Sequence, residues 1–191
     1  MQMDSNISIN KKYLSLIELD TDENIICMIR KHPIGLVGVI GGGLFIALAV
    51  FVATYYSGIY ISGQEEFDTQ LPIGTIIAVI GAVVSVIVLF FTYVAAYIYR
   101  NNVIIVTSEK IAQILYRNLI DRKISQLSLG DIQDVTVDQE GIPARIFKYG
   151  TLVIETAGEQ DNYNFTYTPY PYDCAEELVG AREASIRAYG N

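Results

Sequence analysis

The sequence has few of the residues from which catalytic and metal sites are built. It contains one histidine, His32, and two cysteines, Cys27 and Cys174, among 191 residues. A zinc site takes four ligands, mostly Cys and His, and a hydrolytic triad needs a base close to its nucleophile. These residues provide neither set, so we predict no catalytic, cofactor-binding or metal site and interpret the chain as non-enzymatic. The two cysteines lie in apolar patterns and are expected to be small buried side chains.

Charged residues are missing from two long apolar runs. Neither Pro33–Gly63 nor Thr69–Tyr99 contains Asp, Glu, Lys or Arg. A helix needs about 20 mostly apolar residues to cross the hydrocarbon core of a bilayer. The two runs therefore predict a two-helix transmembrane hairpin over residues 33–99, with a short outer loop at 57–71. Two helices cannot enclose a pore, and these hold no charged residue for a transport pathway, so transport by this chain alone is disfavoured.

Basic residues flank both apolar runs, whereas the loop between them is acidic. Lys and Arg beside membrane spans mark the cytoplasmic side. The basic residues are Arg30, Lys31, Arg100 and Lys110, and the acidic residues of the loop are Glu65, Glu66 and Asp68. We therefore expect a protein of the cell (inner) membrane with both termini in the cytoplasm. Residues 1–32 are too polar for a secretory signal and are predicted to be a cytoplasmic N-terminal segment.

Small residues recur at helical spacing within both runs. Gly38 and Gly42 form one small-xxx-small pair, and Ala78 and Ala82 form another. Such pairs let helix backbones approach closely where lipid provides no hydrophobic drive. They fit packing of one helix on the other within the hairpin, and they equally fit contact with a second copy or a partner helix.

The hydrophobic period changes after Arg100. Short alternating segments predict strands at 102–107, 110–117, 122–129, 132–139, 151–156 and 163–167. A helix follows, with a capping-box spacing at Asp173 and Glu176 and an apolar face of Cys174, Leu178 and Ala181. Residues 100–191 therefore predict a cytoplasmic, mainly-β domain, an antiparallel bent sheet or roll capped by a C-terminal α-helix.

Three segments of this domain carry a resemblance to a known family. They are Val103–Thr107, Asp131–Val137 and Tyr149–Thr156, and they follow the apolar hairpin. This order resembles the bacterial pleckstrin-homology-like (PH-like) membrane proteins that are anchored by a two-helix transmembrane hairpin. The resemblance implies a PH-like fold and no established catalytic residues. A PH fold has seven strands and the pattern predicts six, so one strand is either missed or supplied by an irregular segment such as 141–148.

Two groups of basic residues are candidate contacts for lipid headgroups or a partner. Arg117, Arg122 and Lys123 flank one predicted hairpin turn, and Arg145 and Lys148 flank another loop. A basic residue near an anionic leaflet contributes about 1 kcal/mol to binding. However, residues 100–191 hold nine Lys and Arg against thirteen Asp and Glu, a net charge of −4. This balance favours an ordinary solvated surface and argues against nucleic-acid binding.

We interpret the chain as a membrane-anchored, non-enzymatic module that recruits or scaffolds a protein partner, or a second copy of itself, at the inner face of the bilayer. Sensing of lipid headgroups is the first alternative, and an accessory role beside a membrane enzyme or transporter is the second. The aromatic run Tyr163–Tyr172 is predicted to form cross-strand and core pairs, with an exposed protein-binding strip as the alternative.

Overall fold

The chain folds into two compact units, which we describe one at a time. The computed structural model describes residues 13, 17, 23–63, 73–156 and 162–189. One unit comprises Gly35–Tyr99, and the other combines Met1–Ile34 with Arg100–Asn191. The second unit is therefore discontinuous in sequence, because the first is inserted into it.

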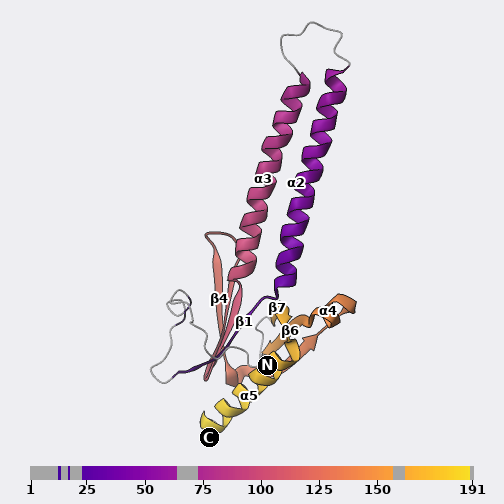
Figure 1. The fold of residues 1–191 in the computed structure, drawn as a ribbon. Helices are drawn as coiled ribbons and strands as arrows, with labels where there is room; N and C mark the ends of the chain where they lie inside the picture. The colour runs from indigo at the N-terminus through magenta and orange to yellow at the C-terminus, as the bar shows by residue number, and fades with distance from the viewer. Residues whose placement is uncertain (1–12, 14–16, 18–22, 64–72, 157–161, 190–191) are drawn as a thin grey trace. The chain divides into compact units, whose positions relative to one another are not determined.

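The first unit is a pair of long apolar helices (Figure 1). Helix α2 spans Pro33–Ser62 and helix α3 spans Ile73–Asn101, with mean hydropathies of 2.6 and 2.9. Both are long and apolar enough to cross a membrane. Helix α2 continues through Ser62, so the prediction that Ser57–Ser62 belongs to the loop is wrong. The acidic residues predicted for that loop lie outside the described residues.

Glycines bring the two helices together. A Cβ atom added at Gly35, Gly43, Gly58 or Gly81 would overlap a residue of the other helix. Close approach also lets the Ser85 hydroxyl donate a hydrogen bond to the Ala47 carbonyl oxygen at 3.1 Å. In contrast, no atom lies within 4 Å of the Cβ positions of Gly38, Gly41 and Gly42. The pair Gly38 and Gly42 is therefore not part of the packing between α2 and α3.

This difference predicts unequal effects of the same substitution along α2. A Cβ at Gly58 would lie 2.5 Å from the backbone carbonyl oxygen of Gly74, which cannot rotate away as a side chain would. We expect Gly58→Val to destabilise the helix pair by about 1–3 kcal/mol through overpacking. Gly41→Val is the matched control and should have little effect. Thermal unfolding in detergent, followed by circular dichroism at 222 nm, measures both, and equal losses would contradict the assignment.

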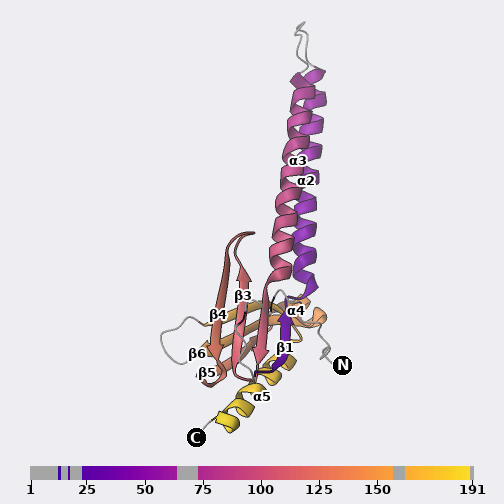
Figure 2. The same ribbon diagram turned by 90° about the vertical axis from the view of Figure 1, so that its left-hand side faces the viewer.

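The second unit contains two antiparallel sheets and a covering helix (Figure 2). The first sheet has the strand order β1-β2-β3-β4 and the second has the order β5-β6-β7. The strands are β1 Ile25–Arg30, β2 Val103–Thr107, β3 Lys110–Tyr116, β4 Arg122–Ser128, β5 Ile132–Asp138, β6 Tyr149–Thr156 and β7 Tyr163–Pro169. Helix α5, Pro171–Tyr189, packs against strands of both sheets. All six predicted strands and the C-terminal helix are confirmed, and the arrangement is a PH-like fold.

The seventh strand comes from the segment before α2. Strand β1 pairs antiparallel with β2, from which it is separated in sequence by both apolar helices. Of the two expectations for the seventh strand, that one strand was missed is confirmed by β1, and that a segment such as 141–148 supplies it is wrong, because Gly141–Phe147 forms the short helix α4. Strand β1 was hard to find because its apolar residues, Ile25–Ile29, are continuous and show no alternation with polar residues. Part of the segment assigned as a separate N-terminal region is thus an edge strand of the sheet.

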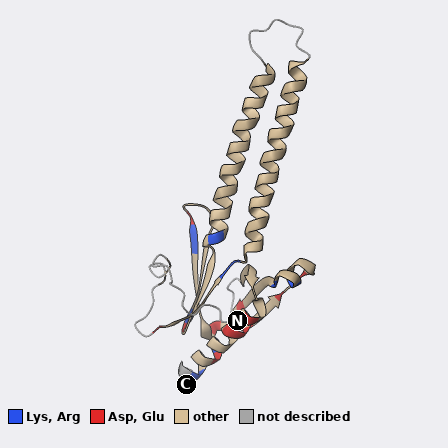
Figure 3. Cartoon of the chain, in the orientation of Figure 1, with Lys and Arg blue, Asp and Glu red and all other residues tan. Residues whose placement is uncertain are grey.

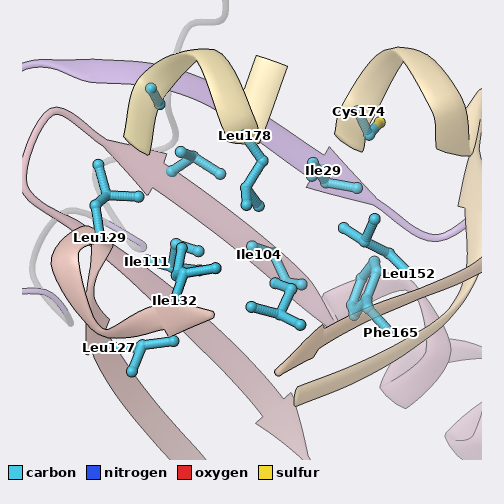
Figure 4. Close-up of a cluster of buried hydrophobic side chains, with 13 residues drawn as sticks. Ile29, Ile104, Ile111, Leu127, Leu129, Ile132, Leu152, Phe165, Cys174 and Leu178 are labelled. Carbon is cyan, nitrogen blue, oxygen red and sulfur yellow. The ribbon is translucent and has the colours of Figure 1, made fainter. Parts of the chain in front are cut away.

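Helix α5 closes the core of this unit. Its residues Cys174, Leu178 and Ala181 are buried, as predicted. The core that they complete includes Ile104, Ile132 and Phe165, which are gathered between α5 and the two sheets (Figure 4). The predicted capping box is wrong, because the helix begins at Pro171 and Asp173 lies inside its first turn. Proline suits the first helical position, where its fixed φ is already helical and its missing N–H has no partner to lose.

The two cysteines belong to this core region. Cys174 is buried and Cys27 is half-buried, and both are free thiols. Burial, followed by the nearby carboxylates of Glu177 and Asp173, raises the pKa of Cys174 to about 12. Burial, followed by Glu177, also raises the pKa of Cys27. Both groups are therefore protonated at neutral pH and behave as small apolar side chains rather than as nucleophiles.

A buried ion pair attaches the start of β1 to the turn between β2 and β3. The Glu23 carboxylate lies 3.0 Å from the Lys110 ammonium group, and the Glu23 side chain is fully buried. The Thr107 hydroxyl donates a hydrogen bond to the other Glu23 carboxylate oxygen. Since a buried carboxylate is costly unless it is paired, this contact fixes where the N-terminal segment joins the sheet.

Candidate functional site

Both connections to the apolar helices lie at one end of the first sheet, where β1 and β3 end and β2 and β4 begin. Arg30 at the end of β1 pairs with Val103 at the start of β2, and Val103 pairs with Ile114 near the end of β3. Tyr116, where β3 ends, pairs with Arg122, where β4 begins. We call this end of the sheet, together with the turn 117–121, the junction edge. The chain leaves it toward α2 at Pro33 and returns to it from α3 at Asn101.

The β3–β4 turn is fixed to the point where the chain returns from α3. The Asn102 side-chain oxygen accepts a hydrogen bond from the Tyr116 backbone N–H at 2.7 Å, and this contact is buried. Within the turn, the backbone N–H groups of Arg117 and Asn118 donate to the Asp121 carbonyl oxygen. At its tip, Leu119 and Ile120 are 53% and 92% exposed. The turn therefore presents two apolar side chains beside the chain connection.

Basic residues are concentrated at the junction edge. Those on the two connections and on the turn are Arg30, Lys31, Arg100, Arg117, Arg122 and Lys123. Asp121 is the one acidic residue of the turn, and its carboxylate accepts a hydrogen bond from the Asn118 side chain at 3.2 Å. Three of the five predicted site residues, Arg117, Arg122 and Lys123, are thus brought together here and are all exposed.

Acidic residues lie toward the other end of the same sheet and on α5. Near the opposite end of its strands are Glu23, Glu109 and Asp131. Helix α5 carries Asp173, Glu176, Glu177 and Glu183. Figure 3 shows basic positions of β4 in blue and acidic positions of α5 in red. The net charge of −4 is therefore an average over two differently charged regions, and it does not describe the junction edge.

The residues just before α2 are held by the second sheet. The backbone N–H of His32 donates to the Tyr167 carbonyl oxygen at 2.5 Å, and the His32 ring lies 5.7 Å from that of Tyr149. Tyr149 and Tyr167 stack at 5.4 Å. The Lys31 ammonium group donates to the Thr166 hydroxyl at 3.1 Å. Partial burial in these contacts lowers the pKa of both Lys31 and His32.

A bulge in β7 shapes this contact. The β6–β7 register shifts between Gly150 and Leu152, where β7 has one residue more than β6. Tyr167 has φ of 58°, a left-handed conformation that costs a bulky residue about 1–3 kcal/mol. The contacts of Tyr167 with His32 and Tyr149 oppose this cost. A Cβ at Gly150 would lie 2.7 Å from the Asp138 carbonyl oxygen, so close approach of backbone, and not a positive φ, requires glycine there.

The other two predicted site residues belong to α4. Arg145 lies within this helix, and Lys148 is its C-terminal cap with a left-handed backbone. They were expected to flank a loop, and that expectation is wrong. The Lys148 ammonium group lies 5.7 Å from the centre of the Tyr170 ring. The five predicted basic residues therefore form two groups, one on the β3–β4 turn and one on α4.

A family model of the bacterial PH domain matches residues 36–179. The chain belongs to this family. No curated protein and no solved structure matches it. The PH-family match includes both apolar helices and begins after β1, so the family model covers the inserted hairpin but not the first strand of the PH-like unit. PH-like domains are generally non-enzymatic.

Sequence reasoning missed the apolar residues that accompany the basic groups. In the PH-like unit, Leu119 and Ile120 lie in a turn, a position usually occupied by polar residues or glycine. This apolar pair between basic residues was a usable signal. Of the aromatic run, Phe165 is buried, whereas Tyr167, Tyr170 and Tyr172 are exposed. The prediction of core and cross-strand pairs therefore holds for Phe165 and for Tyr167, which stacks on Tyr149 of the neighbouring strand, and fails for Tyr170 and Tyr172.

A shallow cavity of about 280 Å³ lies beside α4 in the PH-like unit. It is lined by Asp138, Glu140, Ala144, Tyr149, Gly150, Thr151, Thr166 and Tyr167. Its two charged side chains are carboxylates, which repel a phosphate group. The basic residues of α4 therefore do not converge on this cavity as an anion-binding pocket.

Proposed function

We propose that this protein is a non-enzymatic, membrane-anchored PH module that rests its junction edge on the anionic cytoplasmic leaflet of the cell membrane. One observation carries the proposal. The edge that joins the sheet to both membrane-length helices is also the edge with the basic, apolar-tipped β3–β4 turn. Chain connectivity keeps the residues that precede Pro33 and follow Asn101 next to the two helices.

The distribution of charge decides between attraction and repulsion. Each Lys or Arg close to an anionic leaflet contributes about 1 kcal/mol, and salt screens charges beyond about 8 Å. Strand β3 has seven residues and is therefore about 20 Å long. The acidic residues at the far end of this sheet are thus about two screening lengths from the β3–β4 turn, and the basic residues dominate the field at the turn. This balance favours lipid sensing over the solvated surface that the net charge predicts.

The same arrangement agrees with the proposed orientation. Arg30, Lys31 and Arg100 adjoin the two helices on the side of the PH-like unit. A cytoplasmic location of this unit and of both termini satisfies the preference of basic residues for that side. It also places the basic turn at the leaflet that carries most anionic lipid.

Recruitment of a protein partner or of a second copy is the second proposal. It is supported by the face of α2 formed by Gly38, Gly41 and Gly42, where a neighbouring helix could approach closely. An accessory role beside a membrane enzyme or transporter is the same proposal with a particular partner. Crosslinking in native membranes followed by mass spectrometry tests it, and recovery of the monomer alone would refute it.

A single tryptophan tests the leaflet contact directly. The sequence contains no tryptophan, so Ile120→Trp provides one fluorophore at the tip of the turn. The full chain is reconstituted in vesicles that contain phospholipids with brominated acyl chains, with or without anionic lipid. We expect quenching at least twofold stronger with anionic lipid, and a loss of that gain in 1 M salt or with Arg122→Gln and Lys123→Gln.

The control is Ile186→Trp, near the end of α5, where the side chain is similarly apolar and 42% exposed. It should show little quenching in either kind of vesicle. If the tryptophan at position 120 is quenched no more than the one at position 186, the proposed leaflet contact is refuted.

A further inference from the structure

Helix α4 exposes an unusually apolar surface for its length. It spans Gly141–Phe147, and its side chains of Ile142, Ile146 and Phe147 are 75%, 67% and 49% exposed. Ile142 and Ile146 are four residues apart and therefore lie on the same face. Arg145 and Lys148 are exposed beside them. Apolar residues on one face with adjoining basic groups are typical of helices that lie at a membrane interface.

The helix is held in this orientation by its own contacts. Ala144 is its buried residue, and the Ala144 carbonyl oxygen accepts a hydrogen bond from the Gln139 side-chain amide at 2.9 Å. The same amide donates to the Tyr149 carbonyl oxygen at 3.1 Å. Gln139, which precedes the helix, is thus bonded both to the helix and to the strand that follows it. The Lys148 backbone N–H also donates to Ala144. These contacts fix the buried side and leave the isoleucines directed outward.

Helix α4 is also close to the point where the chain enters α2. Tyr149 follows the helix after one residue, and its ring lies 5.7 Å from that of His32. His32 directly precedes Pro33, the first residue of α2. Phe147 is two residues from Tyr149, which is at most about 7 Å of extended chain. The C-terminal end of α4 therefore lies within a few residues' reach of the start of α2.

We propose that α4 is an interfacial helix that inserts Ile142 and Ile146 among the lipids of the cytoplasmic leaflet, with Phe147 at the flank of this face. Arg145 and Lys148 lie at headgroup level, where phosphates attract them. This proposal rests on the proposed function, because it needs the PH-like unit to lie on that leaflet. It adds an apolar contact that does not depend on anionic lipid. The nearby carboxylates of Asp138 and Glu140 line the cavity beside the helix, and they limit the electrostatic share of the contact.

Phe147→Trp tests the insertion in the full chain reconstituted in vesicles with brominated phospholipids. We expect at least twofold stronger quenching than for Ile186→Trp, and a blue-shifted emission. Because the contact is apolar, the quenching should persist in 1 M salt and without anionic lipid. Adding Ile142→Asp and Ile146→Asp to Phe147→Trp should reduce the quenching to the level of Ile186→Trp. Slow labelling of the buried Cys174 verifies that each variant is folded.

The outcomes separate this proposal from the proposed function. Quenching at position 120 without quenching at position 147 overturns the role of α4 and leaves the leaflet contact of the junction edge intact. A tryptophan at position 147 that is shielded from both brominated lipid and aqueous iodide means that protein covers α4, which also overturns the proposal. Quenching at position 147 that survives high salt supports insertion, even if quenching at position 120 is lost.

Discussion

Replacing Glu23 with alanine is expected to lower the free energy of unfolding of the PH-like unit by about 3–5 kcal/mol. The Glu23 side chain is fully buried and lies 3.0 Å from the Lys110 ammonium group, whose own side chain is only 18% exposed. The substitution leaves this ammonium group mostly buried without its carboxylate. It also removes one of the two acceptors of the Thr107 hydroxyl, the other being the Lys110 carbonyl oxygen. The expected loss is a large share of the 5–15 kcal/mol that stabilises most domains.

The chain offers a matched control for this substitution. Glu183 and Arg187 form an ion pair at 3.4 Å on α5, but their side chains are 58% and 82% exposed. Water screens such a pair, so Glu183→Ala should cost about 0–0.5 kcal/mol. Urea unfolding of the full chain, followed by reaction of Cys174 with a fluorescent maleimide, reports on the PH-like unit because both cysteines of the sequence lie in it. Equal effects of the two substitutions would show that burial of the Glu23 pair does not matter.

A fragment of residues 100–191 is expected not to fold. It lacks β1, so β2 loses the hydrogen bonds of one side and the buried side chains Met28 and Ile29. All five residues of β2 are buried, so the fragment exposes an apolar strand with unpaired backbone groups. Losing one buried isoleucine side chain down to alanine already costs about 2–5 kcal/mol. We expect aggregation or a loss of dispersed amide signals in nuclear magnetic resonance spectra.

A redesigned chain should restore folding without the helices. Arg30 pairs with Val103 in the antiparallel ladder, so Lys31 and Asn102 face each other at its end. A two-residue Asn-Gly turn can join such positions in a β-hairpin. Residues 23–31, this turn and residues 102–189 should give a soluble, folded PH-like unit. A soluble, folded fragment 100–191 would instead show that β1 is dispensable.

Local patterns in the sequence were sufficient for much of this fold. The two uncharged runs predicted both long helices because a bilayer-length apolar helix needs only composition and length. Alternation in segments such as Ile132–Asp138 predicted the strands, since one face of each packs on a core. The predictions failed where neighbours in space decide the structure. Strand β1 depends on a partner beyond both helices, and the sequence near Gly141 gives no sign that a helix replaces a loop.

The candidate site divides in the same way. The basic residues Arg117, Arg122 and Lys123 could be named from the sequence, because they adjoin one turn. Their local charge could not be predicted, because the net charge sums basic and acidic residues that the folded sheet holds at opposite ends of its strands. Only the register of β1, β2 and β3 places that turn beside the chain connections to α2 and α3. The exposure of Ile142 and Ile146 likewise depends on which side of α4 is buried.

The sequence by itself therefore determined that two helices can cross a membrane, where most strands lie and that a helix follows them, because these features follow from hydrophobic period over a few residues. Tertiary structure alone decided that the PH-like unit is completed by a strand from before the helices. It also gathered the basic turn and both connections at one edge. The physical reason is that strand pairing joins residues far apart in the chain, and no local pattern encodes the partner.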